Sequence, residues 1–130
     1  MKNSWVSQFL FRKYDLKSFN CWHLVCTVYA EQLGIQLDSY DGIDPNDRSA
    51  VQGAMQLGSE WVPCDHSHYL ALAVMGRSYD PYHVGVAVAH DLVLHVAQDS
   101  LASVQTPSAL SQAGFTRINY YRHAQDFPRC

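Results

Sequence analysis

The stretch that decides the fold is "FNCWHLVCTVYAEQLGIQL", residues 19–37. Apolar side chains recur within it at three- and four-residue spacing, which predicts an amphipathic helix. Asn20 is a favoured N-cap residue and Gly34 a favoured terminator, so we expect the helix to begin at Cys21 and to end near Gly34. Cys21 then lies in the first helical turn, where unpaired backbone N–H groups and the helix dipole favour a thiolate over a thiol.

The segments on either side of this helix set the fold class. A short amphipathic helix is predicted over 3–11, and a second helix over 46–57, closed by Gly58. From residue 69 onward the pattern changes to short apolar or β-branched runs separated by turn residues, which predicts strands at 69–75, 83–89 and 92–97, a short helix over 106–114 and a last strand over 115–123. Helices followed by an antiparallel meander predict an α+β fold, in one domain spanning 1–130.

Composition excludes several classes of protein. The net charge is −3 and no run of lysine or arginine is present, which argues against a nucleic-acid-binding protein. No segment has the length of a membrane span, and the first 14 residues lack the pattern of a secretory signal, so we expect no membrane insertion. The four cysteines are too few and too irregularly spaced for a disulfide scaffold, and we interpret them as thiols of a protein made in a reducing compartment.

Two histidines are candidates to activate a thiol. A cysteine nucleophile needs a base within hydrogen-bond reach and a group that orients the base. His83 and His95 are 12 residues apart, near the start of one predicted strand and late in the next. A two-residue turn between these strands would pair Val86 with His95 and place the histidines on opposite faces of the sheet. A three-residue turn would pair Gly85 with His95 and place them on the same face, with open space above Gly85, and Asp91 tolerates the left-handed conformation that such a turn needs. The sequence permits either turn.

The remaining histidines and cysteines have less specific patterns. In "CDHSH" (64–68), Cys64, His66 and His68 would share one face of a strand, and zinc accepts sulfur and nitrogen ligands. Structural zinc pairs usually have two or more intervening residues, and no fourth ligand is evident, so we interpret this segment as a solvated loop and predict neither a metal nor another cofactor. Three further histidines are interpreted as surface residues: His23, His90 and His123.

Two segments together resemble a known family. "NCWHLVCTVYAEQLGIQL" followed by "HVGVAVAHDLVLHVA" is similar to the NlpC-type cell-wall cysteine peptidases, and especially to their short phage-tail branch. That branch shows an Asp-Cys-Trp-Gly-Leu-Val opening, a helix ending in Leu-Gly-Ile-x-Leu, and later His-Val-Gly, a hairpin and Leu-His. The similarity runs from near Tyr14 to "NYYRH". The chain departs from the pattern at Asn20, where an aspartate is usual, and at His23, where a glycine is usual.

The resemblance implies a papain-like α+β core and assigns roles to particular residues. Cys21 would be the nucleophile, His83 the general base and His95 the group that orients the base. Tyr14 stands where the family often has a tyrosine that helps to form the oxyanion site. Apart from the resemblance, Trp22 is more typical of core packing than of a ligand contact, although its place next to Cys21 would also let it wall the substrate cleft. The implied substrates are peptide bonds in peptidoglycan stems, commonly the bond between D-glutamate and a diamino acid.

Three interpretations of function follow. The first is a peptidoglycan hydrolase that acts as a component of a phage tail tip or of tail assembly, synthesised in the bacterial cytoplasm, located in the virion tail and bound to tail or baseplate proteins. The second is a structural tail subunit without turnover, which the departures at Asn20 and His23 favour. The third is a toxin amidase delivered by a secretion system.

Overall fold

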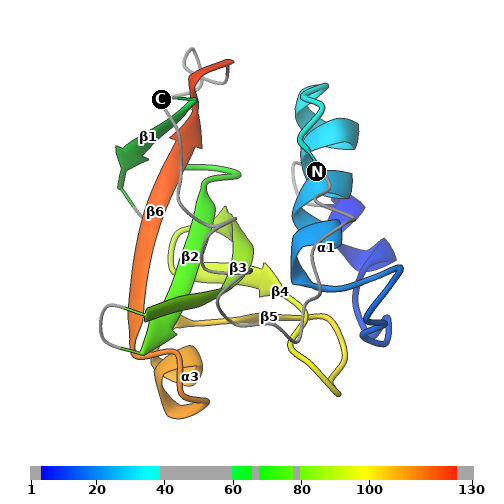
Figure 1. Cartoon of the computed structure of the whole chain (residues 1–130), viewed down its shortest axis with the longest axis vertical. Helices are drawn as coiled ribbons and strands as arrows, with labels where there is room; N and C mark the ends of the chain where they lie inside the picture. Colours follow the sequence, from blue (N-terminus) through cyan, green and yellow to red (C-terminus); the bar gives the residue numbers. More distant parts are fainter. Residues whose placement is uncertain (1–3, 39–59, 66–67, 78–79, 126–130) are drawn as a thin grey trace.

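The protein has an α+β fold (Figure 1). The computed structural model describes residues 4–38, 60–65, 68–77 and 80–125, so the predicted helix at 46–57 lies outside the described residues. The elements in chain order are η1 (Ser4–Gln8), α1 (Cys21–Val28), η2 (Tyr29–Leu33), β1 (Trp61–Cys64), β2 (Leu72–Arg77), β3 (Asp80–Ala89), β4 (Leu92–His95), β5 (Ser103–Gln105), α3 (Pro107–Gln112) and β6 (Arg117–His123). Within these ranges, no helix is long and apolar enough to cross a membrane.

The strands form one antiparallel sheet in the order β1-β6-β2-β3-β4-β5. The strands β2 to β4 follow one another as the predicted meander, and β5 extends it. The last strand, β6, departs from the meander and returns to lie between β1 and β2. The sequence did not predict β1 or β5. β5 has three residues, too few for a periodic pattern, and β1 contains Pro63, which is tolerated because β1 is an edge strand.

The main helix begins and ends where the sequence predicts. The Asn20 side chain accepts a hydrogen bond from the His23 backbone N–H at 2.9 Å, and the Asn20 N–H donates to His23 Nδ1 at 3.3 Å. This reciprocal capping box satisfies donors that have no partner inside the helix, and it fixes Cys21 as the first helical residue. The helix continues through the π-helical turn η2 to Gly34, which ends it at φ 68°. His23 is therefore a half-buried capping residue, and its interpretation as a surface residue was wrong.

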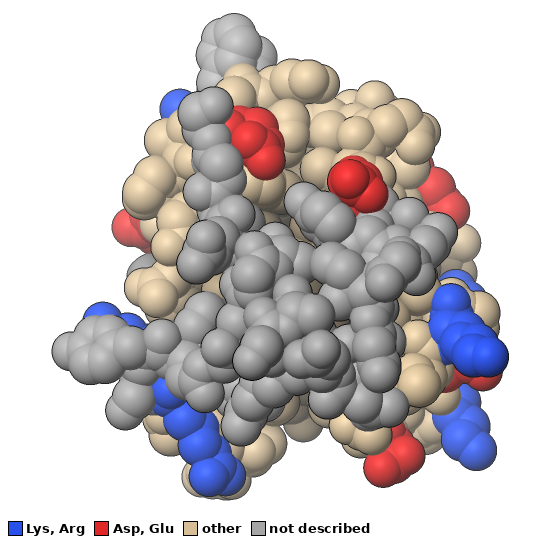
Figure 2. Space-filling view, in the orientation of Figure 1, with Lys and Arg blue, Asp and Glu red and all other residues tan. Residues whose placement is uncertain are grey.

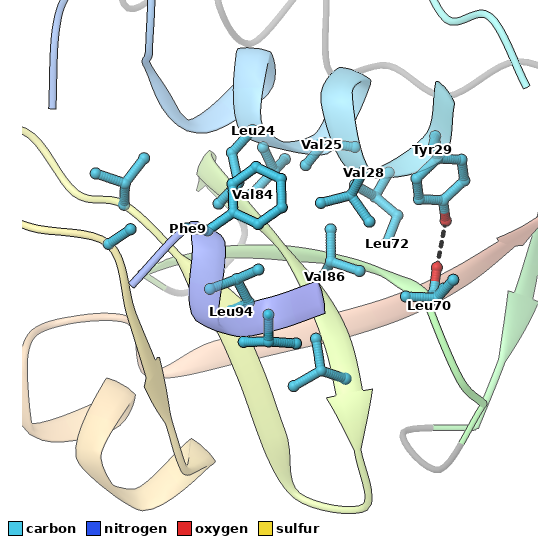
Figure 3. Close-up of a cluster of buried hydrophobic side chains, with 14 of the residues drawn as sticks. Phe9, Leu24, Val25, Val28, Tyr29, Leu70, Leu72, Val84, Val86 and Leu94 are labelled. Atoms are coloured by element: carbon cyan, nitrogen blue, oxygen red, sulfur yellow. Dashed lines mark hydrogen bonds between the residues drawn. The ribbon is translucent and has the colours of Figure 1, made fainter. Parts of the chain in front are cut away.

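The helix covers one face of the sheet. Figure 3 shows Leu24, Val25 and Val28 of α1 pointing toward the sheet, where they meet a cluster of fully buried side chains (Leu72, Val84, Val86 and Leu94). Phe9, which follows η1, is 1% exposed and closes the same core, as predicted for the first amphipathic segment. Burial of each large apolar side chain contributes about 1.5–3 kcal/mol, so this face holds much of the stability of the fold.

A smaller core lies on the opposite face, under α3. Side chains alternate between the two faces along a strand, so the neighbours of the first core residues point to this side. Its buried members are Ala73, Met75, Val93, Leu110 and Phe115. Thr106 caps α3 by accepting from the Ala109 N–H, as predicted for this short helix.

The charged side chains form no continuous patch of one sign on the face shown in Figure 2. Acidic and basic residues are interspersed around its rim.

Candidate active site

The β3–β4 hairpin decides whether the two histidines meet. Ala89 pairs with Leu92 across a two-residue turn, but the register shifts by one between Ala87 and Ala89, so that Val86 pairs with Leu94. The hairpin thus combines the shorter of the two possible turns with a bulge at Val88, and the bulge supplies the shift that the longer turn would have given. Asp91 adopts the expected left-handed conformation, at φ 59°.

The shifted register brings His83 and His95 together. Continuing it by one residue places Gly85 opposite His95, so His83 is the diagonal neighbour of His95 on the same face. A Cβ atom on Gly85 would lie 2.8 Å from the Leu94 carbonyl oxygen and 3.0 Å from the His95 Cβ. The open space expected above Gly85 is therefore absent. The missing side chain instead lets β4 and His95 lie close to β3.

The two imidazoles belong to a chain of hydrogen bonds that crosses three strands. The His83 Nε2 and His95 Nδ1 atoms are 2.9 Å apart, and the His95 Nε2 atom is 2.8 Å from the Gln105 Oε1 atom. Phe115 stacks on the His83 ring, with centroids 4.6 Å apart and an interplanar angle of 19°. Both histidines are buried, at 5% and 4% exposure. Sequence analysis missed Gln105 and Phe115, because neither residue type in a strand or loop signals a place beside an imidazole.

Cys21 meets the sheet beside His83. The backbone N–H groups of Val84, of Trp22 and of Cys21 itself lie close enough to the Cys21 sulfur to favour its thiolate. The Val84 N–H is available because hydrogen bonds along a strand alternate between its two neighbours. Ala87 N–H donates to the Ala71 carbonyl on the β2 side, so the N–H of Val84, three residues earlier, points to the β4 side. Since β4 ends at His95, this N–H lies beyond the last strand residue and is free to bind the sulfur.

Cys21 begins the helix, and His83 and His95 share a face of the sheet, as the fold prediction required, but the pKa of Cys21 differs from the expectation. Burial raises the pKa of the Cys21 thiol above its usual value, and the three N–H groups that lower it do not compensate. Cys21 as a residue is half-buried, but its sulfur is poorly hydrated. The expectation that the helix start favours the thiolate was therefore wrong, because loss of hydration outweighs the N–H groups at the helix terminus.

The histidines are kept neutral by the same cause. Burial, and next the neighbouring His95, lower the pKa of His83 from 6.5 to about 3. Burial also lowers the pKa of His95, whereas the hydrogen bond that His95 donates to Gln105 raises it. At neutral pH the site therefore contains a thiol and two neutral imidazoles.

Tyr14 and Trp22 flank the nucleophile. Burial raises the pKa of Tyr14, and the negative charges of Cys21, Asp99 and Asp15 raise it further, so its hydroxyl stays protonated. The effect of Cys21 shows that the two groups are within electrostatic range of each other. The Trp22 Nε1–H donates to the Asp38 carbonyl at 2.7 Å, which holds the indole against the segment that follows η2. Trp22 follows Cys21 directly in α1, and Tyr14 lies within electrostatic range of Cys21.

The other predicted polar residues lie elsewhere. His90 is exposed in its turn, as predicted, but His68 and His123 are buried, at 8% and 6% exposure, so the expectations of a solvated loop and of a surface residue were wrong for these two. The His123 ring lies edge-on to Trp61, with centroids 5.0 Å apart. His66 lies outside the described residues, and those that are described include no group of three or more His, Cys, Asp or Glu that could hold a metal. Among the described cysteines, Cys21, Cys26 and Cys64 form no disulfide with one another.

Comparison with known proteins identifies the fold. No family model matches the chain, and no curated protein matches it. Among solved structures, the chain is similar to the crystal structure of the NlpC/p60 domain of the peptidoglycan hydrolase SagA, with a TM-score of 0.58 and 14% sequence identity over 88% of this chain and 90% of that one. The chain therefore has the fold of an NlpC/p60 domain.

Proposed function

We propose that this protein is a thiol peptidase that cleaves peptide bonds in bacterial peptidoglycan stems, with Cys21 as nucleophile and His83 as general base. One observation carries the proposal. His83 is hydrogen-bonded to His95, and the residue that follows His83, Val84, directs its backbone N–H at the Cys21 sulfur. The fold shared with the NlpC/p60 domain of a peptidoglycan hydrolase supports the choice of substrate class.

In the proposed acylation step, the Cys21 sulfur attacks the carbonyl carbon of the scissile peptide bond while His83 takes the thiol proton. Since the pKa of the thiol is raised and that of His83 is lowered, no ion pair exists before the substrate binds, and the proton moves as the carbon–sulfur bond forms. The negative charge that develops on the substrate oxygen is stabilised by N–H groups of the first helical turn and by the protonated hydroxyl of Tyr14. Collapse of the tetrahedral intermediate releases the amine, which takes the proton from His83.

In deacylation, His83 removes a proton from water, which attacks the thioester and regenerates the Cys21 thiol with release of the new carboxyl group. His95 holds the His83 ring in the required orientation through their 2.9 Å contact. Neither step requires a metal or another cofactor.

Digestion of purified peptidoglycan sacculi, followed by mass analysis of the released fragments, tests the proposal. The parent protein should release stem-peptide fragments, and Cys21→Ala should release none. Cys26→Ala, which changes a second thiol of the same helix, is the matched control and should retain activity. Equal release by the parent and by Cys21→Ala would refute the assignment of the nucleophile.

The proposed setting is a phage tail tip, where the tail delivers the domain to the wall and tail or baseplate proteins are its partners. This part of the proposal rests on the resemblance of residues 20–37 and 83–97 to the short phage-tail branch. Detection of the chain by mass spectrometry in purified virions, and its absence from tail-less particles, would support it; a chain found solely in the culture fluid would favour the toxin amidase.

A structural tail subunit without turnover is the second candidate. The observation that favours it is the deep burial of His83, whose pKa of about 3 makes it a weak base. Virions that contain the chain, with sacculi left intact by the purified protein and by the virions, would support this function instead.

A further inference from the structure

We infer that Gln105 is a positioning residue that sets the tautomer of both histidines, and thereby leaves the Nδ1 atom of His83 as the proton acceptor for Cys21. This inference deepens the proposed function and rests on it for its catalytic consequence. The arrangement of hydrogen atoms that it requires can be observed without any substrate.

In the chain of hydrogen bonds from His83 through His95 to Gln105, each donor can be identified because the last atom, Gln105 Oε1, can only accept. The Gln105 Oε1 atom, 2.8 Å from His95 Nε2, has no hydrogen to donate, so His95 must carry its proton on Nε2. A neutral imidazole has a single N–H, so the Nδ1 atom of His95 is then an acceptor. His83 must therefore carry its own proton on Nε2 to make the 2.9 Å contact.

The nitrogen left with a lone pair is on the correct side of the ring. Nδ1 is bonded to the ring carbon that carries Cβ, so it lies near the residue's own backbone, whereas Nε2 is directed outward to His95. The next residue along that backbone is Val84, whose N–H binds the Cys21 sulfur. The acceptor atom of His83 is therefore the ring nitrogen nearest to the backbone that continues to Val84.

The sheet register explains why Gln105 can reach His95. Val93 pairs with Gln105 and His95 with Ser103, so Gln105 is the diagonal neighbour of His95 on the face that carries the histidines. His83 stands in the same diagonal relation to His95 across β3 and β4. Three side chains on successive strands therefore form one line, and Gln105 holds its outer end.

Few other groups can set the charge or orientation of the pair. Burial and then His95 lower the pKa of His83, whereas burial lowers the pKa of His95 and its hydrogen bond to Gln105 raises it. Among the described residues packed on this face, Phe115 and Met75 are apolar, and Tyr120 on β6 is the titratable neighbour, electrostatically linked to Asp91. The thiol of Cys21 lies at the end of β4, and the guanidinium of Arg77 lies beside Gly114, next to Phe115.

Nitrogen-15 NMR of the histidine rings at pH 7 tests the inference directly. In the parent protein both His83 and His95 should carry their proton on Nε2. Gln105→Leu removes the acceptor, and His95 should then populate both tautomers. Gln105→Glu keeps an acceptor oxygen, and its carboxylate should raise the pKa of His95 above that in the parent. At a pH above this new pKa, both rings should return to the parent tautomer. His95 protonated on Nδ1 in the neutral parent protein, or an unchanged His95 tautomer in Gln105→Leu, would overturn the inference.

Turnover of sacculi provides the second readout. Loss of one hydrogen bond in the line should lower kcat/KM about 10- to 100-fold in Gln105→Leu. Gln105→Glu should retain most of the activity at high pH, with its acidic limb displaced to higher pH, because a carboxylate stabilises the protonated form of His95. Gln112→Leu, which alters an exposed glutamine of α3, is the matched control and should behave as the parent.

These results separate the inference from the proposed function. Sacculi left intact by a protein whose histidines have the expected tautomers would refute the proposed function and leave the role of Gln105 in the hydrogen-bonded line established. Equal activity of the parent and Gln105→Leu, with parent tautomers in both, would refute the role of Gln105 and leave the nucleophile assignment standing.

Discussion

Acid should destabilise this protein through His83, and the size of the effect follows from its burial. The pKa of His83 is lowered from 6.5 to about 3 in the folded state, so between these values the unfolded chain binds more protons than the folded one. The free energy of unfolding therefore rises with pH across this window and is lost as the pH falls through it. At pH 5, which is 1.5 units below the unfolded pKa, the loss from His83 is about 2 kcal/mol, at 1.36 kcal/mol per unit.

The assay is urea unfolding at pH 7.5 and pH 5, followed by tryptophan fluorescence. The parent protein should lose at least about 2 kcal/mol between the two conditions, because burial also lowers the pKa of His95 and adds a loss of the same sign. His83→Leu removes the titrating ring from an apolar site beside Phe115, and its loss should be smaller than that of the parent by about 2 kcal/mol. The quantity compared is the difference in the free energy of unfolding between pH 7.5 and pH 5, so a lower absolute stability of the variant does not affect it.

His90 provides the matched control. Its side chain is 66% exposed in the hairpin turn, so His90→Gln should leave the difference between pH 7.5 and pH 5 as it is in the parent. A parent protein equally stable at both pH values, or His83→Leu with the full acid loss, would refute the argument that His83 is held neutral by burial.

Three further outcomes are expected. Gly85→Ala would place a methyl group 2.8 Å from a carbonyl oxygen of β4, so thermal unfolding should show a loss of about 1–3 kcal/mol, and an unchanged melting temperature would contradict the close approach of the strands. Tyr29→Phe removes the hydroxyl that donates to the Leu70 carbonyl inside the core, and urea unfolding should show a cost of about 1–3 kcal/mol, whereas no measurable cost would mean that water replaces the donor. Labelling of Cys21 by iodoacetamide, followed by mass spectrometry of its peptide, should accelerate beyond pH 9.0, the ordinary pKa of a thiol, and a plateau near neutral pH would show that the thiolate already exists.

The sequence was sufficient to predict the helix that carries Cys21, because local chemistry determines both of its ends. Asn20 caps through its own side chain, and Gly34 adopts a backbone conformation that glycine accepts without strain. The strands β2, β3, β4 and β6 were predictable for a related reason, since each is long enough to show an apolar pattern. The residues 39–59 are not described, so the helix predicted there stays a prediction.

Features that depend on tertiary contacts were not predictable. The burial of His123 follows from the return of β6 to a place between β1 and β2, where its ring meets Trp61, and no local pattern specifies that return. The place of Gln105 beside His95 also depends on tertiary contacts. It lies on a strand of three residues, and it becomes part of the site because the registers of two strand pairs align it with His95. The pKa of Cys21 was wrongly predicted because a helix start is a local feature, whereas loss of hydration is a property of the packed structure.

A one-residue shift in register at Val88 separates a sheet that brings the histidines together from one that does not. Without the bulge, the two-residue turn would pair Val86 with His95, and the His95 ring would point into the core under α1. With it, His95 lies on the face that carries His83 and Gln105, and the line of hydrogen bonds can form. The bulge disrupts the ladder pairing between β3 and β4 and leaves the Val88 side chain in the first core, at 3% exposure. The bulge and the glycine opposite His95, which admits no side chain, together give the register and the close approach of the strands on which the site depends.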